Sequence, residues 1–145
     1  MTPEHEALVK ASWRRFEPVA DEWAIVFYQR LFQLHPDSRT LFATTEMTDQ
    51  PRKFAGMLGW IVLALDQPDR LVAEVARLGR RHQAYGVRDA DYASMGAALL
   101  WTLEQAFGVE WTPELQAAWA EAFLLLSWVM RRAALKATVE FPAIA

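Results

Sequence analysis

LGRRHQAYGV, residues 78–87, contains a histidine at the point where an apolar helical face should continue. The apolar residues of that face, spaced by three or four positions, are Leu71, Val75 and Leu78. His82 is the next position on the same face, and Gly86 then ends the helix. The imidazole is therefore predicted to point inward, either as a core histidine with one hydrogen bond or as a ligand waiting for a metal.

The composition predicts a chain that folds around a sizeable core. Of its 145 residues, 53% are hydrophobic and 23% are charged, which is typical of a globular protein and argues against a disordered one. We expect a single domain over residues 1–145. Seven Trp and eight Phe give the interior much flat aromatic surface, for which bulky core filling is the commoner reason.

The charges and the missing cysteines exclude several kinds of site. The net charge is −3, and the one basic cluster, Arg77, Arg80 and Arg81, is too short for the footprint of a nucleic-acid binder. The absence of cysteine excludes disulfides, thiolate metal sites and a cysteine nucleophile. It also fits a reducing compartment, so a cytoplasmic location is expected.

The apolar segments are too short to cross a membrane. The start of the chain, MTPEHEALVK, lacks the basic residues and the apolar run of a signal peptide. The longest uncharged apolar runs are MLGWIVLAL (57–65) and AFLLLSWVM (122–130), each about half of the roughly 20 residues that a bilayer requires. Both are predicted to be buried helices, without membrane insertion.

Helical periodicity continues along the whole chain, and no segment reads convincingly as a strand. Thr2-Pro3 and Thr112-Pro113 each combine a capping residue with a proline at the first helical position. A short helical turn is expected over residues 36–42. Breaks between helices are expected at Pro18, residues 43–49, residues 66–69, Gly86 and Gly108. The pattern predicts an all-α fold of seven to eight helices.

Two polar side chains on other helices are available to the same interior. Gln50 lies four residues before Phe54 on an apolar line, where a capping or rim glutamine is the commoner reading. Tyr28 lies beside the apolar face of its helix, between Ile25 and Phe32, where a core tyrosine is usual. Together with the inward histidine, they describe one imidazole with an amide and a phenol nearby.

A metal site built from protein ligands alone is disfavoured. A zinc site needs three or four ligands. His5 is expected in an exposed first turn, His35 in a loop before a proline, and no acidic residues cluster with His82. One imidazole is enough only where another group supplies the remaining ligands, as a haem porphyrin does.

Three stretches of the sequence resemble the globin family, and within it the single-domain bacterial globins related to flavohaemoglobins. They are VFYQRLFQLHPDSRTLF, DQPRKFAGMLG and LGRRHQAYGV. The pattern FYxxLFxxxP followed by LF, then QxRK, then RRHxxYGV, covers nearly the whole chain in order. The resemblance implies a globin fold, with three helices crossing three and haem b between the Gln50 helix and the His82 helix.

The resemblance also implies roles for individual residues. His82 matches the histidine that ligates the haem iron, and Tyr28 and Gln50 match the distal residues that donate hydrogen bonds to its ligand. The haem contacts that it implies are Phe42, Lys53, Phe54, Leu78, Val87 and Tyr92. Lys53 would lie near a propionate, although a solvated lysine is nearly as common. Phe54 stands where the family more often has an aliphatic residue, which predicts a tighter ligand space.

One position departs from the flavohaemoglobin pattern. Those proteins pair the tyrosine that Tyr92 matches with a glutamate of the last helix, and the matching position here is Ala133 or Ala134. A backbone carbonyl of the His82 helix would then have to hold the imidazole. The departure disfavours peroxidase-like or fast dioxygenase chemistry.

The resemblance implies reversible binding of O2, and of CO and NO, at ferrous iron, for carriage or storage. Two alternatives stay open: a nitric-oxide dioxygenase that takes electrons from an external reductase, and a gas sensor. A globin-fold interaction domain without haem is disfavoured, because the buried His82 would then have no evident partner. The expected oligomeric state is a monomer or a homodimer.

Overall fold

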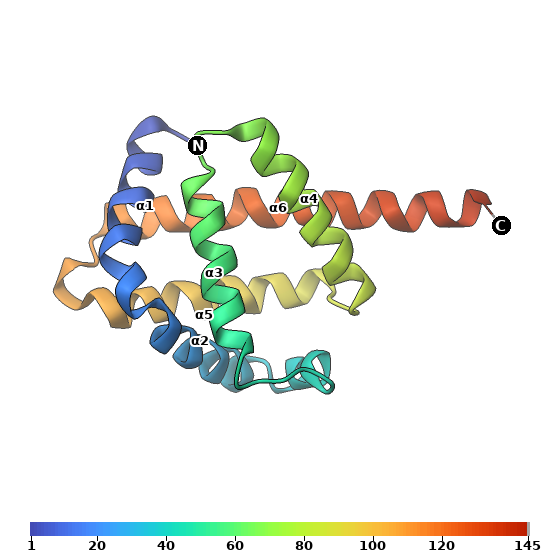
Figure 1. Ribbon diagram of the computed structural model, residues 1–145, viewed down its shortest axis with the longest axis horizontal. Helices are drawn as coiled ribbons and strands as arrows, with labels where there is room; N and C mark the ends of the chain where they lie inside the picture. Colours follow the sequence, from blue (N-terminus) through green and yellow to red (C-terminus); the bar gives the residue numbers. More distant parts are fainter. Residues whose placement is uncertain (145) are drawn as a thin grey trace.

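The computed structural model describes residues 1–144, and their side chains as far as residue 136. Its six α-helices are α1 (Pro3–Phe16), α2 (Ala20–Leu34), α3 (Gln50–Leu63), α4 (Pro68–Ala84), α5 (Asp89–Phe107) and α6 (Pro113–Ile144) (Figure 1). Three short 3₁₀ helices join them: η1 (Glu17–Val19), η2 (Pro36–Phe42) and η3 (Gly108–Glu110). No strand occurs among these residues, so the all-α prediction is confirmed. No helix in the same range is long and apolar enough to cross a membrane.

Local sequence signals fix most of the helix ends. The hydroxyls of Thr2 and Thr112 each accept a hydrogen bond from the backbone N–H three residues later, at 3.1 Å in both cases. Gly86 and Gly108 adopt φ angles of 95° and 58°, which favour glycine and end α4 and α5. The loop predicted over residues 66–69 is shorter than expected. α4 already begins at Pro68, whose fixed φ suits a first helical turn.

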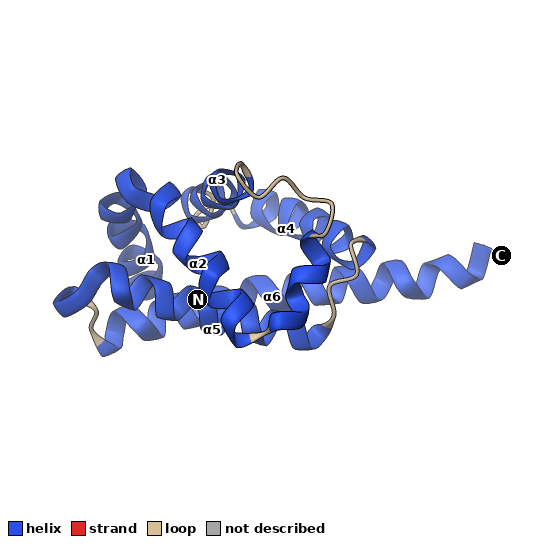
Figure 2. Cartoon of the chain, turned by 90° about the horizontal axis from the view of Figure 1, so that it is seen from below, coloured by secondary structure: helices blue, strands red, loops and turns tan. Residues whose placement is uncertain are grey.

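The helices form two layers that cross each other. Figure 1 shows α5 and α6 running side by side, with α1, α3 and α4 crossing over them, and Figure 2 shows α3 and α5 on opposite sides of the molecule. α3 packs against α1 and α2, whereas α4 packs against α6. α3 and α4 are therefore anchored on different partners, although only residues 64–67 separate them.

Two apolar clusters fill the space between the layers. The larger one contains the buried aromatic residues Trp13, Phe16, Phe27, Tyr28 and Trp119. The smaller one joins α3, α4, α5 and α6 through Ile61, Ala64, Leu71, Val75, Tyr92 and Met130. Most of the aromatic surface that the composition provides is thus used as core.

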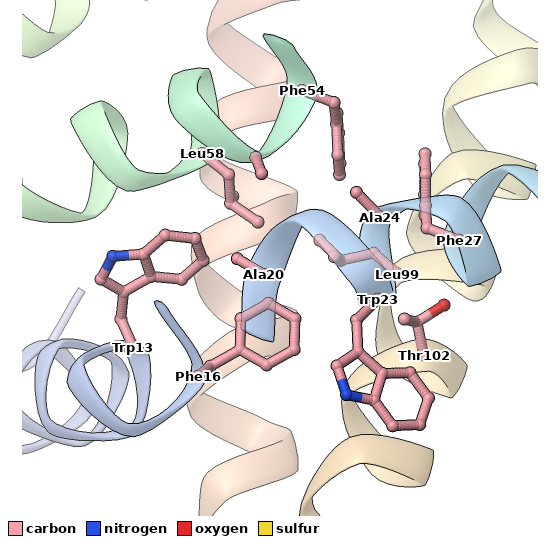
Figure 3. Close-up of a pocket in the computed structure, with 11 residues that line it drawn as sticks. Trp13, Phe16, Ala20, Trp23, Ala24, Phe27, Phe54, Leu58, Leu99 and Thr102 are labelled. Carbon is pink, nitrogen blue, oxygen red and sulfur yellow. The ribbon is translucent and has the colours of Figure 1, made fainter. Parts of the chain in front are cut away.

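A small apolar cavity of about 10 Å³ lies in the larger cluster (Figure 3). Figure 3 shows Phe54 and Leu58 of α3 facing it from one side, with Phe16 of α1 and Trp23 of α2 on the other. A single water needs about 10–15 Å³ and two to four polar partners. The cavity is therefore a packing gap of the core and not a ligand site.

Candidate functional site

His82 lies in the last turn of α4, with its ring partly buried. Its Nδ1 lies 2.9 Å from the carbonyl oxygen of Leu78, one turn earlier in the same helix. Because a carbonyl can only accept, Nδ1 carries the proton, and the neutral ring has its lone pair on Nε2. Burial lowers the pKa of His82, and the hydrogen bond to Leu78 opposes this effect. The prediction that a backbone carbonyl holds the imidazole is confirmed, and Nε2 is the nitrogen able to bind a metal.

The position of α4 depends on a close contact with α6 at Gly79. A Cβ atom at Gly79 would lie 2.3 Å from the carbonyl oxygen of Met130, so only glycine fits this approach. Gly79 is three residues before His82 and therefore sets where the last turn of α4 lies. Gly79 was not among the residues predicted from the sequence to shape the site. Its one signal was a glycine inside an otherwise regular helical pattern.

A cavity of about 150 Å³ separates α3 from α4. Its lining residues are Met57, Trp60 and Ile61 of α3 and Glu74, Val75 and Leu78 of α4. Leu78 both lines this cavity and accepts the hydrogen bond from His82, so one residue connects the cavity and the imidazole. Of these residues, only Leu78 was among the predicted site residues.

Tyr28 and Gln50 lie together although they belong to different helices. The Gln50 amide Nε2 donates a hydrogen bond to the Tyr28 hydroxyl oxygen at 3.1 Å. Tyr28 is only 5% exposed, and this burial raises its pKa, while the hydrogen bond from Gln50 acts in the opposite direction. Because the hydroxyl oxygen accepts from Gln50, its own proton can be donated to a third group.

Three aromatic rings hold Tyr28 in place. The ring centroids of Phe27, Phe42 and Phe54 lie 5.0, 5.3 and 5.8 Å from that of Tyr28, all in edge-to-face arrangements. Phe54 also stacks on Phe27 at 4.4 Å, so its ring is fixed between the core and the tyrosine. The structure thus brings together Tyr28, Gln50, Phe42 and Phe54, and their roles toward a haem stay a prediction.

The expected neighbours of Tyr28 were half right. Phe32 lies within 6.1 Å of the tyrosine ring, but Ile25 is 50% exposed and forms no wall. Residues three positions apart on a helix differ by about 60° around its axis. Because both residues lie at the edge of the apolar face of α2, this rotation leaves Tyr28 in the core and Ile25 exposed to solvent.

The remaining predicted haem contacts divide into two groups. Leu78 and Val87 pack against the smaller cluster, which contains the buried Tyr92. The pKa of Tyr92 is raised, and burial is the main cause. Lys53 is exposed, and its Nζ lies 3.8 Å from a carboxylate oxygen of Asp49. The structure therefore places Lys53 on the surface, one turn after the start of α3.

The other two histidines bind carboxylates of other helices. His5 Nδ1 pairs with Glu121, and His35 Nε2 lies 2.9 Å from Asp91. The expectation of an exposed His5 was wrong, because α6 passes close enough to partly cover it. Among the described residues, no group of three or more His, Cys, Asp or Glu side chains could hold a metal ion.

α3 and α4 run in opposite directions, so the start of α3 and the end of α4 lie at the same end of the pair (Figure 1). Gln50 and His82 occupy these two positions. Comparison with protein families shows that a model described as Globin matches residues 25–130. The chain belongs to the globin family. Globins are haem-containing proteins that bind diatomic gases.

Three relatives show how this globin compares with characterised family members. It is 29% identical over 141 residues to leghemoglobin alpha of Phaseolus vulgaris, which covers 91% of this chain and 96% of the relative. It is 28% identical over 141 residues to a leghemoglobin of Psophocarpus tetragonolobus, covering 91% and 97%. It is 26% identical over 136 residues to the anaerobic nitrite reductase HBII of Casuarina glauca, covering 84% and 85%.

The side chains of this globin fit the haem that the family implies. The donor set is a single neutral imidazole with Nε2 available, which is too little for a zinc site but sufficient for a haem iron. One residue, Leu78, both lines the cavity between α3 and α4 and holds that imidazole. The hydrogen-bonded Tyr28 and Gln50 supply polar donors at the start of α3, which lies at the same end of the helix pair as His82.

Proposed function

We propose that this globin reversibly binds O2 at the ferrous iron of a haem b ligated by His82. The observation that carries the proposal is the Tyr28–Gln50 hydrogen bond, which leaves the proton of a buried phenol free for donation near the start of α3. When bound, the haem supplies an iron whose open coordination position takes O2, CO or NO.

The contribution of His82 is a ligand of fixed orientation. The Leu78 carbonyl holds the ring and sets its tautomer, so Nε2 is directed away from α4 without help from a second side chain. Val75 and Leu78 precede His82 on the same helix and pack in the smaller apolar cluster, and they would limit the access of water to a haem bound there.

The contribution of Tyr28 and Gln50 is retention of the ligand. With haem present, these side chains would donate to a gas ligand that carries partial negative charge, and a hydrogen bond to a charged acceptor contributes about 1.5–3 kcal/mol. Since about 1.4 kcal/mol is a factor of ten, the Tyr28 hydroxyl would slow O2 release by about tenfold or more. Gln50 supports this role by holding the hydroxyl oxygen from the other side.

A visible absorption spectrum of the purified protein tests the proposal. After reconstitution with haem and anaerobic reduction, the spectrum should change reversibly on exposure to O2 and then to CO. A protein that takes up no haem, or a ferrous form that O2 leaves unchanged, would contradict it.

A second candidate is NO dioxygenation, which the same Tyr28–Gln50 pair favours through its match to the flavohaemoglobin pattern. This reaction consumes NO, O2 and one electron and forms nitrate, so it needs an external reductase. α6 has Ala133 and Ala134 where those proteins have a glutamate. The pKa of Tyr92 is raised here mainly by burial and then by the charge of Asp89, and the charge of Arg131 opposes this rise. The second candidate is distinguished by stoichiometric loss of the oxygenated form on addition of NO, and by steady nitrate production once a reductase is supplied.

A further inference from the structure

The carboxylate of Asp91 bonds to two different parts of the chain. One oxygen accepts the backbone N–H of Arg88 at 2.7 Å, which caps the start of α5. The other lies 2.9 Å from Nε2 of His35, at the junction of α2 and η2. Because a carboxylate can only accept, Nε2 of His35 is the donor. The Asp91 side chain is only 4% exposed, so its charge depends on these partners, which together form the Asp91 bridge.

Capping of α5 explains only one of the two bonds. A carboxylate in the first turn of a helix is a common cap, and it needs no side chain from elsewhere. The bond to His35 instead joins residues 56 positions apart in the sequence. A second contact joins the same two regions, because a Cβ atom at Gly86 would lie 3.9 Å from a methyl carbon of Leu41 in η2. η2 therefore lies beside the turn between α4 and α5.

The Arg88 end of the bridge leads to His82. The N–H of Val87 donates to the carbonyl of His82 at 3.0 Å. Arg88 is the next residue, and its N–H is the one that Asp91 accepts. The turn that follows His82 is therefore held between the last turn of α4 and the Asp91 carboxylate.

The His35 end of the bridge leads to Tyr28. His35 donates its N–H to the carbonyl of Leu31 at 2.9 Å, and its own carbonyl accepts the N–H and the hydroxyl of Ser38. Tyr28 precedes His35 by two helical turns, so the two residues lie on the same side of α2. η2 ends at Phe42, whose ring contacts that of Tyr28 edge to face. His35 therefore anchors both segments that place the Tyr28 ring.

We propose that Asp91 is a positioning residue that couples the two sides of the candidate haem site. Its carboxylate joins the turn after His82 to the junction of α2 and η2, and so fixes where the Tyr28 hydroxyl lies relative to the imidazole. This inference rests on the proposed function. A hydrogen bond weakens steeply once its length and angle leave the usual range, so a small shift of α2 would reduce the retention of O2. Retention of CO, which carries less charge, would change less.

Substitutions at His35 break the bridge without removing the cap of α5. His35→Leu removes the ring donor, whereas His35→Gln keeps an N–H donor of similar reach. His5→Leu is the matched control, because His5 also pairs with a carboxylate of another helix, that of Glu121, and its side chain is 30% exposed against 24% for His35. Urea unfolding of each variant measures its loss of stability, which separates general loosening from an effect on the site.

Gas release from the haem-loaded protein tests the positioning role. His35→Leu should raise the O2 dissociation rate about threefold or more, while the CO rate stays within about twofold of the wild type. The infrared band of the CO form should shift in the same direction as in Tyr28→Phe. His35→Gln should restore both quantities, and His5→Leu should change neither. Equal effects of His35→Leu and His5→Leu, or equal changes for O2 and CO, would overturn the proposal.

A double variant tests whether Asp91 and His35 act through one link. Asp91→Ala should raise the O2 dissociation rate at least as much as His35→Leu, because it removes both bonds of the bridge. Adding His35→Leu to Asp91→Ala should then change the rate little further, as expected for two partners of one interaction. Additive changes would contradict the bridge.

Amide hydrogen exchange of the haem-free chain gives a measurement that does not depend on gas binding. His35→Leu should speed exchange in residues 36–42 and also at Val87 and Arg88, across the bridge, and His5→Leu should speed neither. Faster exchange in residues 36–42 alone would refute the coupling. A wild-type protein that takes up no haem would contradict the proposed function, and the exchange result would still decide the bridge. A haem-loaded His35→Leu protein that retains O2 as the wild type does would contradict the positioning role alone.

Discussion

The two sides of the candidate haem site are built by different means. His82 is oriented by the backbone, through the carbonyl of Leu78 in its own helix, and α4 is positioned by the contact of Gly79 with the backbone of Met130. Tyr28 and Gln50 are oriented by side chains, through their mutual hydrogen bond and the surrounding aromatic rings. The His82 side therefore depends on the position of α4, whereas the Tyr28 side depends on the identity of the side chains that surround the tyrosine.

Because of this difference, substitutions should affect the orientation of His82 and the distal hydrogen bond in different ways. A backbone carbonyl remains whatever the side chain at position 78 is, so the orientation of His82 is insensitive to most nearby substitutions. The distal pair loses its hydrogen bond when either partner is replaced. Ligand affinity should therefore be adjustable through Tyr28 and Gln50, whereas haem retention should depend mainly on His82 itself and on the placement of α4.

The largest effect is expected from His82→Ala, which removes the proposed iron ligand while leaving the Leu78 carbonyl in place. The variant should lose most of its haem, and added imidazole should restore binding, because a small ligand can enter the vacated space. Absorption spectra of haem-titrated protein measure both. Tight haem binding with an unchanged ferrous spectrum would show that another residue ligates the iron.

The next largest effect is expected from Gly79→Ala, with Gly56→Ala as its matched control. The new methyl group would overlap the Met130 backbone at 2.3 Å, which side-chain movement cannot relieve, so the free energy of unfolding should fall by about 1–3 kcal/mol. At Gly56, an exposed position of α3, a Cβ meets nothing within 4 Å, and the same change should stabilise the protein by about 0.5–1 kcal/mol. Urea unfolding of the two apoproteins measures the contrast. Changes of the same sign would mean that α4 is not held by this contact.

The same contrast explains what the sequence predicted well. The inward position of His82 followed from helical spacing along α4, which depends only on local geometry. The caps at Thr2 and Thr112 and the breaks at Gly86 and Gly108 are local as well, and the structure confirms them. Features within one helix turn were therefore accessible before the fold was known.

What the sequence did not predict requires contacts between distant segments. A glycine is needed at position 79 only because the backbone of α6 passes within van der Waals distance of it. No residue close to Gly79 in the sequence indicates this contact. The cover over His5 comes from Glu121, and the exposure of Ile25 depends on how α2 is rotated against its neighbours. Spacing alone indicated a core tyrosine at Tyr28 and a rim glutamine at Gln50 that face the same interior, and the resemblance then implied their shared role as distal residues.

A smaller effect is expected from the distal substitutions. Tyr28→Phe keeps the ring among its aromatic neighbours and removes only the hydroxyl, so the O2 dissociation rate should rise at least several-fold, with a much smaller change for CO. Gln50→Leu should raise it less, because Gln50 lies in a first helical turn and is only partly buried. Stopped-flow measurements of both variants give the ranking, and equal or reversed effects would contradict it.

The double variant sharpens this comparison. Because Gln50 donates to the Tyr28 hydroxyl, part of its effect on ligand release should pass through the tyrosine. The combined change in the double variant should therefore be smaller than the sum of the two single changes, as is usual for residues in direct contact. Additive changes would show that the two side chains act on the ligand independently.

The smallest effect is expected from pH. The Tyr28 hydroxyl can donate only while it is protonated, and burial raises its pKa above the ordinary value of 10.0. Since the folded protein disfavours the phenolate, the Tyr28 hydroxyl is fully protonated at neutral pH and loses its proton only as the pH rises through this raised pKa. The stability of the folded protein also falls once the pH exceeds the pKa that the phenol has in the unfolded chain. The O2 dissociation rate should therefore stay constant from about pH 6 to about pH 9, and so should the ratio between Tyr28→Phe and the wild type. Stopped-flow measurements across this range check both quantities. A contradicting result would be an O2 dissociation rate that rises several-fold by the upper end of this pH range in the wild type but not in Tyr28→Phe. It would show that the phenol loses its proton at a lower pH than its burial implies, and that more water reaches it than the surrounding aromatic rings indicate.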